Sequence, residues 1–256
     1  MDASKMMILG LTWALMIPWL SLVAIAAVLA FKKWQRTKDF LKRQMFYLWL
    51  GATIVFIGDS LHTIADTIST YTNSPTGPLQ ILGTIFEFRT FAMAFDVLVF
   101  IVYYTLWALF IVTRYQQNQL ESRDKITIGL AIVAMVLILP GLVPNALGIY
   151  TLEYNITIWA PHIIFFIIFG VMTVWKLIRC SRHALTQTSD PLVQTQERSL
   201  SITGIGFACS FLFFILSLAL IPLNEKFGMF MIPKTFAYML AFIYLIKGIK
   251  LSTPNA

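Results

Sequence analysis

The sequence predicts an all-α membrane protein, a bundle of seven transmembrane helices with the N-terminus outside and the C-terminus in the cytoplasm. Three observations lead to this prediction: the composition, the number of apolar segments and the distribution of basic residues. The 256 residues are 58% hydrophobic and only 12% charged, whereas soluble domains carry about 25% charged residues. We expect a single transmembrane domain over residues 1–256, because no polar stretch is long enough to form a separate soluble one.

The first three predicted helices are separated by one basic connection and one turn. The first covers about residues 7–31 and contains Pro18, which predicts a kink. The second, about residues 45–70, follows the most basic stretch of the chain and ends at a turn with two prolines and a glycine. The third, about residues 79–113, is longer than the roughly 20 residues that cross a bilayer. We therefore expect it to tilt or to extend past the membrane.

The remaining four helices are bounded by prolines and polar connections. The fourth ends at a pair of prolines, and the fifth leads into the longest polar connection, residues 179–199. A short turn with Pro222 and Gly228 joins the sixth helix to the seventh. These four helices cover about residues 126–143, 159–178, 200–220 and 229–249.

The distribution of Lys and Arg sets the predicted orientation. The connections after the first, third and fifth helices and the C-terminal tail are basic, while the other three connections share one basic residue, Lys226. Because cytoplasmic loops carry an excess of Lys and Arg, we expect a multi-pass protein of the cell membrane with its basic connections inside. The net charge of +7 comes from these loops, so the expected partner is the lipid bilayer and not a nucleic acid.

The second predicted helix contains three side chains that are unusual in a membrane span, Asp59, His62 and Asp66. At about 100° per residue, their spacing places them within an arc of about 60° on one helix face. A charged side chain at the centre of a bilayer costs at least about 2.5–3.5 kcal/mol, so such residues usually face a protein interior or a water-filled cavity. We therefore expect this face to line an internal site.

Further polar side chains of the third, fifth and seventh helices lie at the same predicted depth, the outer half of the bundle. The candidate ligand- or ion-binding residues are Asp59, His62, Asp66, Glu87, Arg89, Asp96, His162 and Lys234. The four carboxylates among them, if ionised, exceed the two cations Arg89 and Lys234 by two charges. Because such an imbalance is unfavourable in a low dielectric, we expect protons, a cation or a ligand to compensate it.

The leading interpretation is a receptor-like or sensory protein. It would bind a small ligand or ion from outside and pass a helix rearrangement to a cytoplasmic effector protein. An anionic group of the ligand would meet Arg89 and Lys234. A proton- or cation-coupled transporter and a purely structural polar network are alternatives, because a seven-helix topology alone does not define a function.

A metal-dependent intramembrane hydrolase acting on a lipid is a further alternative, so whether the chain is an enzyme stays open. Catalytic zinc sites use three protein ligands and a water, and His62, Asp66 and His162 supply three ligands for Zn or another cation. The two-histidine HExxH pattern is absent. Retinal is not expected as a cofactor, because the middle of the last predicted helix has no lysine; Lys234 lies near its outer end.

Aromatic and basic residues at the span ends are interpreted as anchors. The third helix ends with Arg114 and Tyr115, and no acid precedes the arginine as it does in animal seven-helix receptors. Arg and Tyr at such positions are common interfacial anchors, and the seven tryptophans include several near the span ends, as expected of an interfacial belt.

Overall fold

The computed structural model describes residues 3–74, 77–81, 84–147, 152–220 and 231–252. Within these ranges the chain forms seven helices and one antiparallel pair of strands. The elements are α1 (Ala3–Arg36), α2 (Asp39–Thr72), β1 (Pro78–Ile81), β2 (Thr84–Glu87), α3 (Phe88–Tyr115), α4 (Ser122–Ala146), α5 (Leu152–Gln187), α6 (Pro191–Leu220) and α7 (Met231–Leu251).

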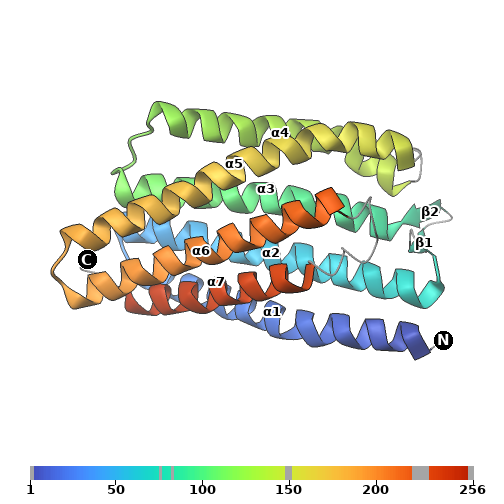
Figure 1. Cartoon of the computed structure of the whole chain (residues 1–256), viewed down its shortest axis with the longest axis horizontal. Coiled ribbons are helices and arrows are strands. Elements are labelled where there is room, and N and C mark those ends of the chain that lie inside the picture. Colours follow the sequence, from blue (N-terminus) through green and yellow to red (C-terminus); the bar gives the residue numbers. More distant parts are fainter. Residues whose placement is uncertain (1–2, 75–76, 82–83, 148–151, 221–230, 253–256) are drawn as a thin grey trace.

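The helices form a closed bundle in which each helix packs against its neighbours in the sequence. Contacts between α1 and α7 close the ring, and α3 contacts α5 in addition to α2 and α4. The N-terminus and the strand hairpin lie at one end of the bundle, and the C-terminus lies at the other (Figure 1). The helices α2 and α3 pack extensively against each other. Of the six candidate membrane spans, α3 has the largest buried share.

Six helices of the described part are long and apolar enough to cross a membrane: α1, α2, α3, α5, α6 and α7. Many of their large apolar side chains, for example Ile17, Ile168 and Trp175, are exposed on the outside of the bundle. Such a surface suits contact with lipid and is unusual for a soluble protein. The fold is thus a helical membrane-protein bundle, as the composition predicts. The remaining helix, α4, carries Arg123 and Asp124 in its first turn.

The expectation of one long third helix over residues 79–113 is wrong at its beginning. Pro78–Ile81 and Thr84–Glu87 form the antiparallel strands β1 and β2, in which Pro78 pairs with Glu87 and Ile81 with Thr84. Proline is compatible with the first position of a strand, and the β-branched and aromatic residues of β2 favour extended backbone. The helix begins only at Phe88, so the extra length that suggested a tilted span is not helical.

The helices also continue beyond the predicted apolar spans. The connection predicted over residues 179–199 is mostly helical, because α5 ends at Gln187 and α6 begins at Pro191. The backbone N–H of Leu192 donates to Asp190 Oδ1 at 2.8 Å, and proline is favoured in the first turn that follows such a cap. Hydropathy detects only the lipid-facing part of a helix, while Arg, Gln and Glu continue it readily in water.

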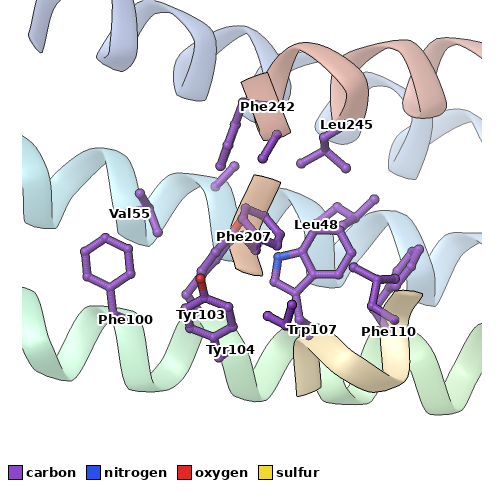
Figure 2. Packing of buried hydrophobic residues seen from close by; sticks show 14 of the residues in the cluster. Leu48, Val55, Phe100, Tyr103, Tyr104, Trp107, Phe110, Phe207, Phe242 and Leu245 are labelled. Carbon is purple, nitrogen blue, oxygen red and sulfur yellow. The ribbon is translucent and has the colours of Figure 1, made fainter. Parts of the chain in front are cut away.

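The centre of the bundle is a layer of aromatic side chains. Figure 2 shows Tyr103, Tyr104 and Trp107 of α3 beside Phe207 of α6 and Phe242 of α7. The Phe207 ring lies 5.9 Å from those of Tyr103 and Tyr104 and 5.4 Å from that of Trp107. This layer separates two polar clusters, one toward the hairpin and one toward the opposite end.

Candidate functional site

Asp59 is the deepest carboxylate of the predicted site. It lies on α2 and is 8% exposed. The indole Nε1 of Trp19 on α1 donates to Asp59 Oδ2 at 2.7 Å, so Trp19 is a buried hydrogen-bond donor to this carboxylate. A Cβ at the neighbouring Gly58 would lie 3.0 Å from the Val99 side chain of α3. The glycine therefore allows α2 and α3 to approach closely beside this carboxylate.

His62 connects two further carboxylates across the α2–α3 interface. Its Nδ1 lies 3.2 Å from Asp96 Oδ2 of α3, and its Nε2 lies 3.5 Å from Asp66 Oδ2 one turn along α2. A neutral imidazole has one N–H donor and a protonated one has two, so only the protonated ring donates to both carboxylates. Arg89 Nε donates to the other oxygen of Asp66, Oδ1, at 2.7 Å. The result is a continuous polar chain from Arg89 to Asp96.

Asp96 borders a small cavity in the interior of the bundle. The cavity has a volume of about 50 Å³ and is lined by Lys234 and aromatic side chains as well as by Asp96. The second carboxylate oxygen, Oδ1, is buried and has no hydrogen-bond partner among the described residues. A buried polar atom without a partner costs free energy, so Asp96 is a residue of the cavity wall that has an unused hydrogen-bond acceptor.

Lys234 of α7 is held by aromatic rings. Its Nζ lies 5.7 Å from the ring centroid of Phe100, 5.1 Å from that of Phe214 and 5.9 Å from that of Tyr238. Cations within about 6 Å of a ring face are attracted by its quadrupole. These rings come from α3, α6 and α7, so the ammonium group joins three helices at the rim of the cavity that Asp96 borders.

We call these residues, Asp59, His62, Asp66, Arg89, Asp96 and Lys234, the hairpin-end cluster. The side chains of His62, Asp66 and Arg89 are 32%, 35% and 37% exposed, whereas that of Asp96 is 14% exposed. The polar chain thus leads from the surface toward the interior. Three carboxylates face two permanent cations and one histidine, which is a smaller imbalance than the sequence suggested.

Of the eight predicted site residues, the structure places Glu87 apart from this cluster and does not describe the side chain of His162. Glu87 lies at the end of β2 and not on the third helix, and Thr90 Oγ1 donates to its Oε2 at 3.4 Å. His162 belongs to α5, but its side chain lies outside the described residues. Among the residues that the structure describes, no group of three His, Cys, Asp or Glu side chains is arranged to hold a metal ion. The zinc site predicted from His62, Asp66 and His162 therefore stays a prediction.

A second polar cluster lies at the end of α3 opposite the hairpin, and we call it the Arg114 cluster. Arg114 donates from Nη2 and Nε to Glu197 Oε1 of α6 at 2.5 and 3.0 Å, and from Nη1 to Gln44 Oε1 of α2 at 3.0 Å. The Tyr115 hydroxyl donates to the other oxygen of Glu197 at 2.5 Å. Arg114 and Tyr115 are therefore a link between α2, α3 and α6, and their interpretation as interfacial anchors is wrong.

The sequence contains weak signals for two interactions that it did not predict, Trp19 with Asp59 and Arg114 with Glu197. An aspartate inside a membrane span needs a donor, and Trp19 on the preceding helix is a donor-only side chain. Glu197 lies in the segment that the sequence predicts to be a basic connection, yet it is only 2% exposed. A buried carboxylate needs a cation, and Arg114 is a basic residue at the end of a neighbouring span on the same side of the predicted membrane.

Comparison with known proteins adds no family to this description: no family model, curated protein or solved structure shows significant similarity to the chain. The fold itself defines the class. Six long apolar helices, closely packed around an aromatic centre, make this a multi-pass membrane protein.

Proposed function

We propose that this chain is a receptor-like sensor that binds a small cation from outside in the hairpin-end cluster. The observation that carries the proposal is Asp96: one of its oxygens is buried without a partner among the described residues, at the rim of an internal cavity. Carboxylate oxygens are the ligands that hard cations prefer. The cavity of about 50 Å³ has room for one small ion or one water and not for a hydrated ion, because one water occupies about 30 Å³ in the liquid.

The contacts of the two cations favour a cationic ligand over an anionic one. Arg89 is engaged by Asp66 at 2.7 Å, and the ammonium of Lys234 faces three aromatic rings. An anion would have to displace Asp66 or the rings. A cation would instead add to the three carboxylates, which exceed the two permanent cations by one charge.

The membrane arrangement is part of the proposal. The basic connections predict that the hairpin end faces outside and the C-terminal end faces the cytoplasm of the cell. We propose that α4 is the seventh span. The partly exposed side chains of His62, Asp66 and Arg89 would then be the entry point for a ligand from outside.

Signal transfer would use the helices that both clusters share. A cation that draws Asp66 and Asp96 together shifts α2 relative to α3, provided that it binds the shifted arrangement more tightly. At the other end the same two helices are joined to α6 through Arg114. A change in their packing would therefore reach the cytoplasmic surface, where an effector protein would respond.

A transporter and a metal-dependent hydrolase are the alternatives from other functional classes. Between the two polar clusters the bundle is filled by the aromatic layer around Phe207, which supports a sensor over a transporter that moves ions through this part of the bundle. The hydrolase depends on His162 as a third zinc ligand.

Thermal unfolding in lipid nanodiscs tests the proposal. Na⁺, Ca²⁺ and Zn²⁺ are titrated separately, and one of them is expected to raise the Tm of the wild-type protein in a saturable way. The Asp96→Asn variant is expected to lose this shift. Glu121→Gln, which removes an exposed carboxylate at the opposite end, is the control and should keep it. A shift that survives in Asp96→Asn contradicts the proposed site, and a zinc-specific shift that requires His162 would favour the hydrolase.

A further inference from the structure

A large groove lies at the end of the bundle opposite the hairpin. It has a volume of about 920 Å³ and is formed by residues from the end of α3, the beginning of α4 and the last turns of α5. Its walls carry basic and hydrogen-bonding side chains, among them Arg123, Lys176, Arg179, His183, Ser122 and Thr127. The groove shares no lining residue with the hairpin-end cluster, so it would bind a different ligand from the proposed cation.

The groove contains two acidic side chains, Glu121 and Asp124, and both lie beside the ammonium of Lys176. Glu121 is 63% exposed, and its Oε2 lies 3.8 Å from Lys176 Nζ. Asp124 is buried; its Oδ1 contacts the ammonium of Lys176, and its Oδ2 accepts the backbone N–H of Glu121 at 3.0 Å. Among the described residues no ion pair engages Arg123 or Arg179, and both are exposed. The two guanidinium groups therefore remain available for an anion, and planar guanidinium groups suit the oxygens of a phosphate.

An apolar cavity adjoins the basic groove. It has a volume of about 230 Å³, lies between α5 and α6, and is lined by Val171, Val174, Ile178, Phe211, Leu212 and neighbouring apolar residues. Trp175 lines both cavities and is 67% exposed. On α5 the residues of the apolar cavity lie between Val171 and Ile178, and two basic residues of the groove, Arg179 and His183, follow them toward the end of the helix. This order matches an amphiphile that lies with its chain in the membrane and its charged head at the surface.

We propose that the groove and the adjoining cavity together bind an anionic phospholipid. The phosphate lies between Arg123 and Arg179, and the first part of one acyl chain packs on Trp175 and enters the apolar cavity. Basic pockets between membrane helices on the cytoplasmic side are suited to anionic headgroups, and tryptophan is favoured at the level of the headgroups. A soluble phosphate ester would use the basic wall alone and would leave the apolar cavity empty.

The bound lipid would lie beside the Arg114 cluster. Tyr115, whose hydroxyl donates to Glu197, also forms part of the groove wall. The lipid would thus stabilise the packing of α3 against α4 and α5 at the end where α2, α3 and α6 are joined.

Lipid binding to the purified protein in detergent tests this inference. The affinities for phosphatidylglycerol and phosphatidylcholine are compared by native mass spectrometry, with Arg123→Gln, Arg179→Gln and, as a matched control, Arg182→Gln. Arg182 is exposed on α5, the helix that also carries Arg179, but it does not line the groove. Each groove variant is expected to weaken phosphatidylglycerol binding about fivefold, the equivalent of about 1 kcal/mol per basic residue. The control is expected to bind as the wild type does.

Three further measurements distinguish the lipid from other occupants. Trp175→Ser is expected to weaken lipid binding, and glycerol phosphate, which has the head without the chains, is expected to bind far more weakly than the lipid. Alkylation of Cys180, which lines the groove, should slow in a Cys209→Ser background when phosphatidylglycerol is added. Equal binding of both lipids, an equal loss in Arg182→Gln, or equal binding of glycerol phosphate would overturn the proposal.

Discussion

The two polar clusters at opposite ends of α2 and α3 differ in how completely their side chains are paired. In the Arg114 cluster one arginine meets one glutamate, and both oxygens of Glu197 accept hydrogen bonds of 2.5 Å. In the hairpin-end cluster the His62 contacts are 3.2 and 3.5 Å long. There Asp96 also keeps one buried oxygen without a partner among the described residues.

This difference separates a structural link from a site that can bind. A saturated, buried ion pair offers no vacant ligand position, and breaking it leaves an unpaired charge. In the hairpin-end cluster the contacts of His62 are long, one buried oxygen of Asp96 is unpaired among the described residues, and the carboxylates outnumber the permanent cations. Such a cluster can rearrange around an added cation at lower cost. The same two helices therefore carry a rigid contact at one end and an adaptable one at the other.

The largest effect on stability is expected at the Arg114 cluster. Glu197→Ala leaves the guanidinium of Arg114 buried without its carboxylate and should lower the free energy of unfolding by about 3–5 kcal/mol. Replacing both residues by methionine should recover most of this loss, because no buried charge remains. Denaturant unfolding in detergent measures both variants. If Glu197→Ala unfolds like the wild type, the contrast between the two clusters is wrong.

A smaller loss is expected for the hydrogen bond from Trp19 to the buried Asp59 of the hairpin-end cluster. Trp19→Phe keeps an aromatic ring beside Phe242 and removes the donor to Asp59, which should cost about 1–3 kcal/mol. Trp13→Phe is the matched control, because Trp13 donates to Thr67 at a partly buried position and its loss should cost less. Thermal unfolding of the two variants side by side tests this order; an equal loss would argue against a special role for Asp59.

The smallest effect on stability is expected at the surface of the same cluster. Asp66→Asn weakens the ion pair with Arg89. Both side chains of this pair are more than a third exposed, and exposed ion pairs contribute about 0–1 kcal/mol to the free energy of unfolding. The variant should therefore unfold close to the wild type but bind cations more weakly, because one carboxylate is gone. Unfolding and cation titration of the same preparation separate these two effects. A large loss of stability would make Asp66 a structural residue.

The sequence predicted the helical membrane class and pointed to a polar face on α2 because both depend on local properties. Apolar runs and three polar residues at helical spacing are visible in one segment. Which distant partner each polar group meets is decided by packing, so the pairs Trp19–Asp59 and Arg114–Glu197 were not predictable. The β1–β2 hairpin was missed because its apolar residues merge with the following span and give the same hydropathy as a longer helix.

Calorimetric titration of the stabilising cation into three proteins tests most directly whether the hairpin-end cluster binds it. The cation is the one of Na⁺, Ca²⁺ and Zn²⁺ that raises the Tm of the wild type. We predict that the wild type and the Arg114→Met/Glu197→Met variant bind it with Kd values within about threefold, equivalent to about 0.7 kcal/mol, whereas Asp96→Asn shows no measurable binding. Binding that persists in Asp96→Asn, or that disappears in the double methionine variant, would contradict the assignment of the hairpin-end cluster as the binding site.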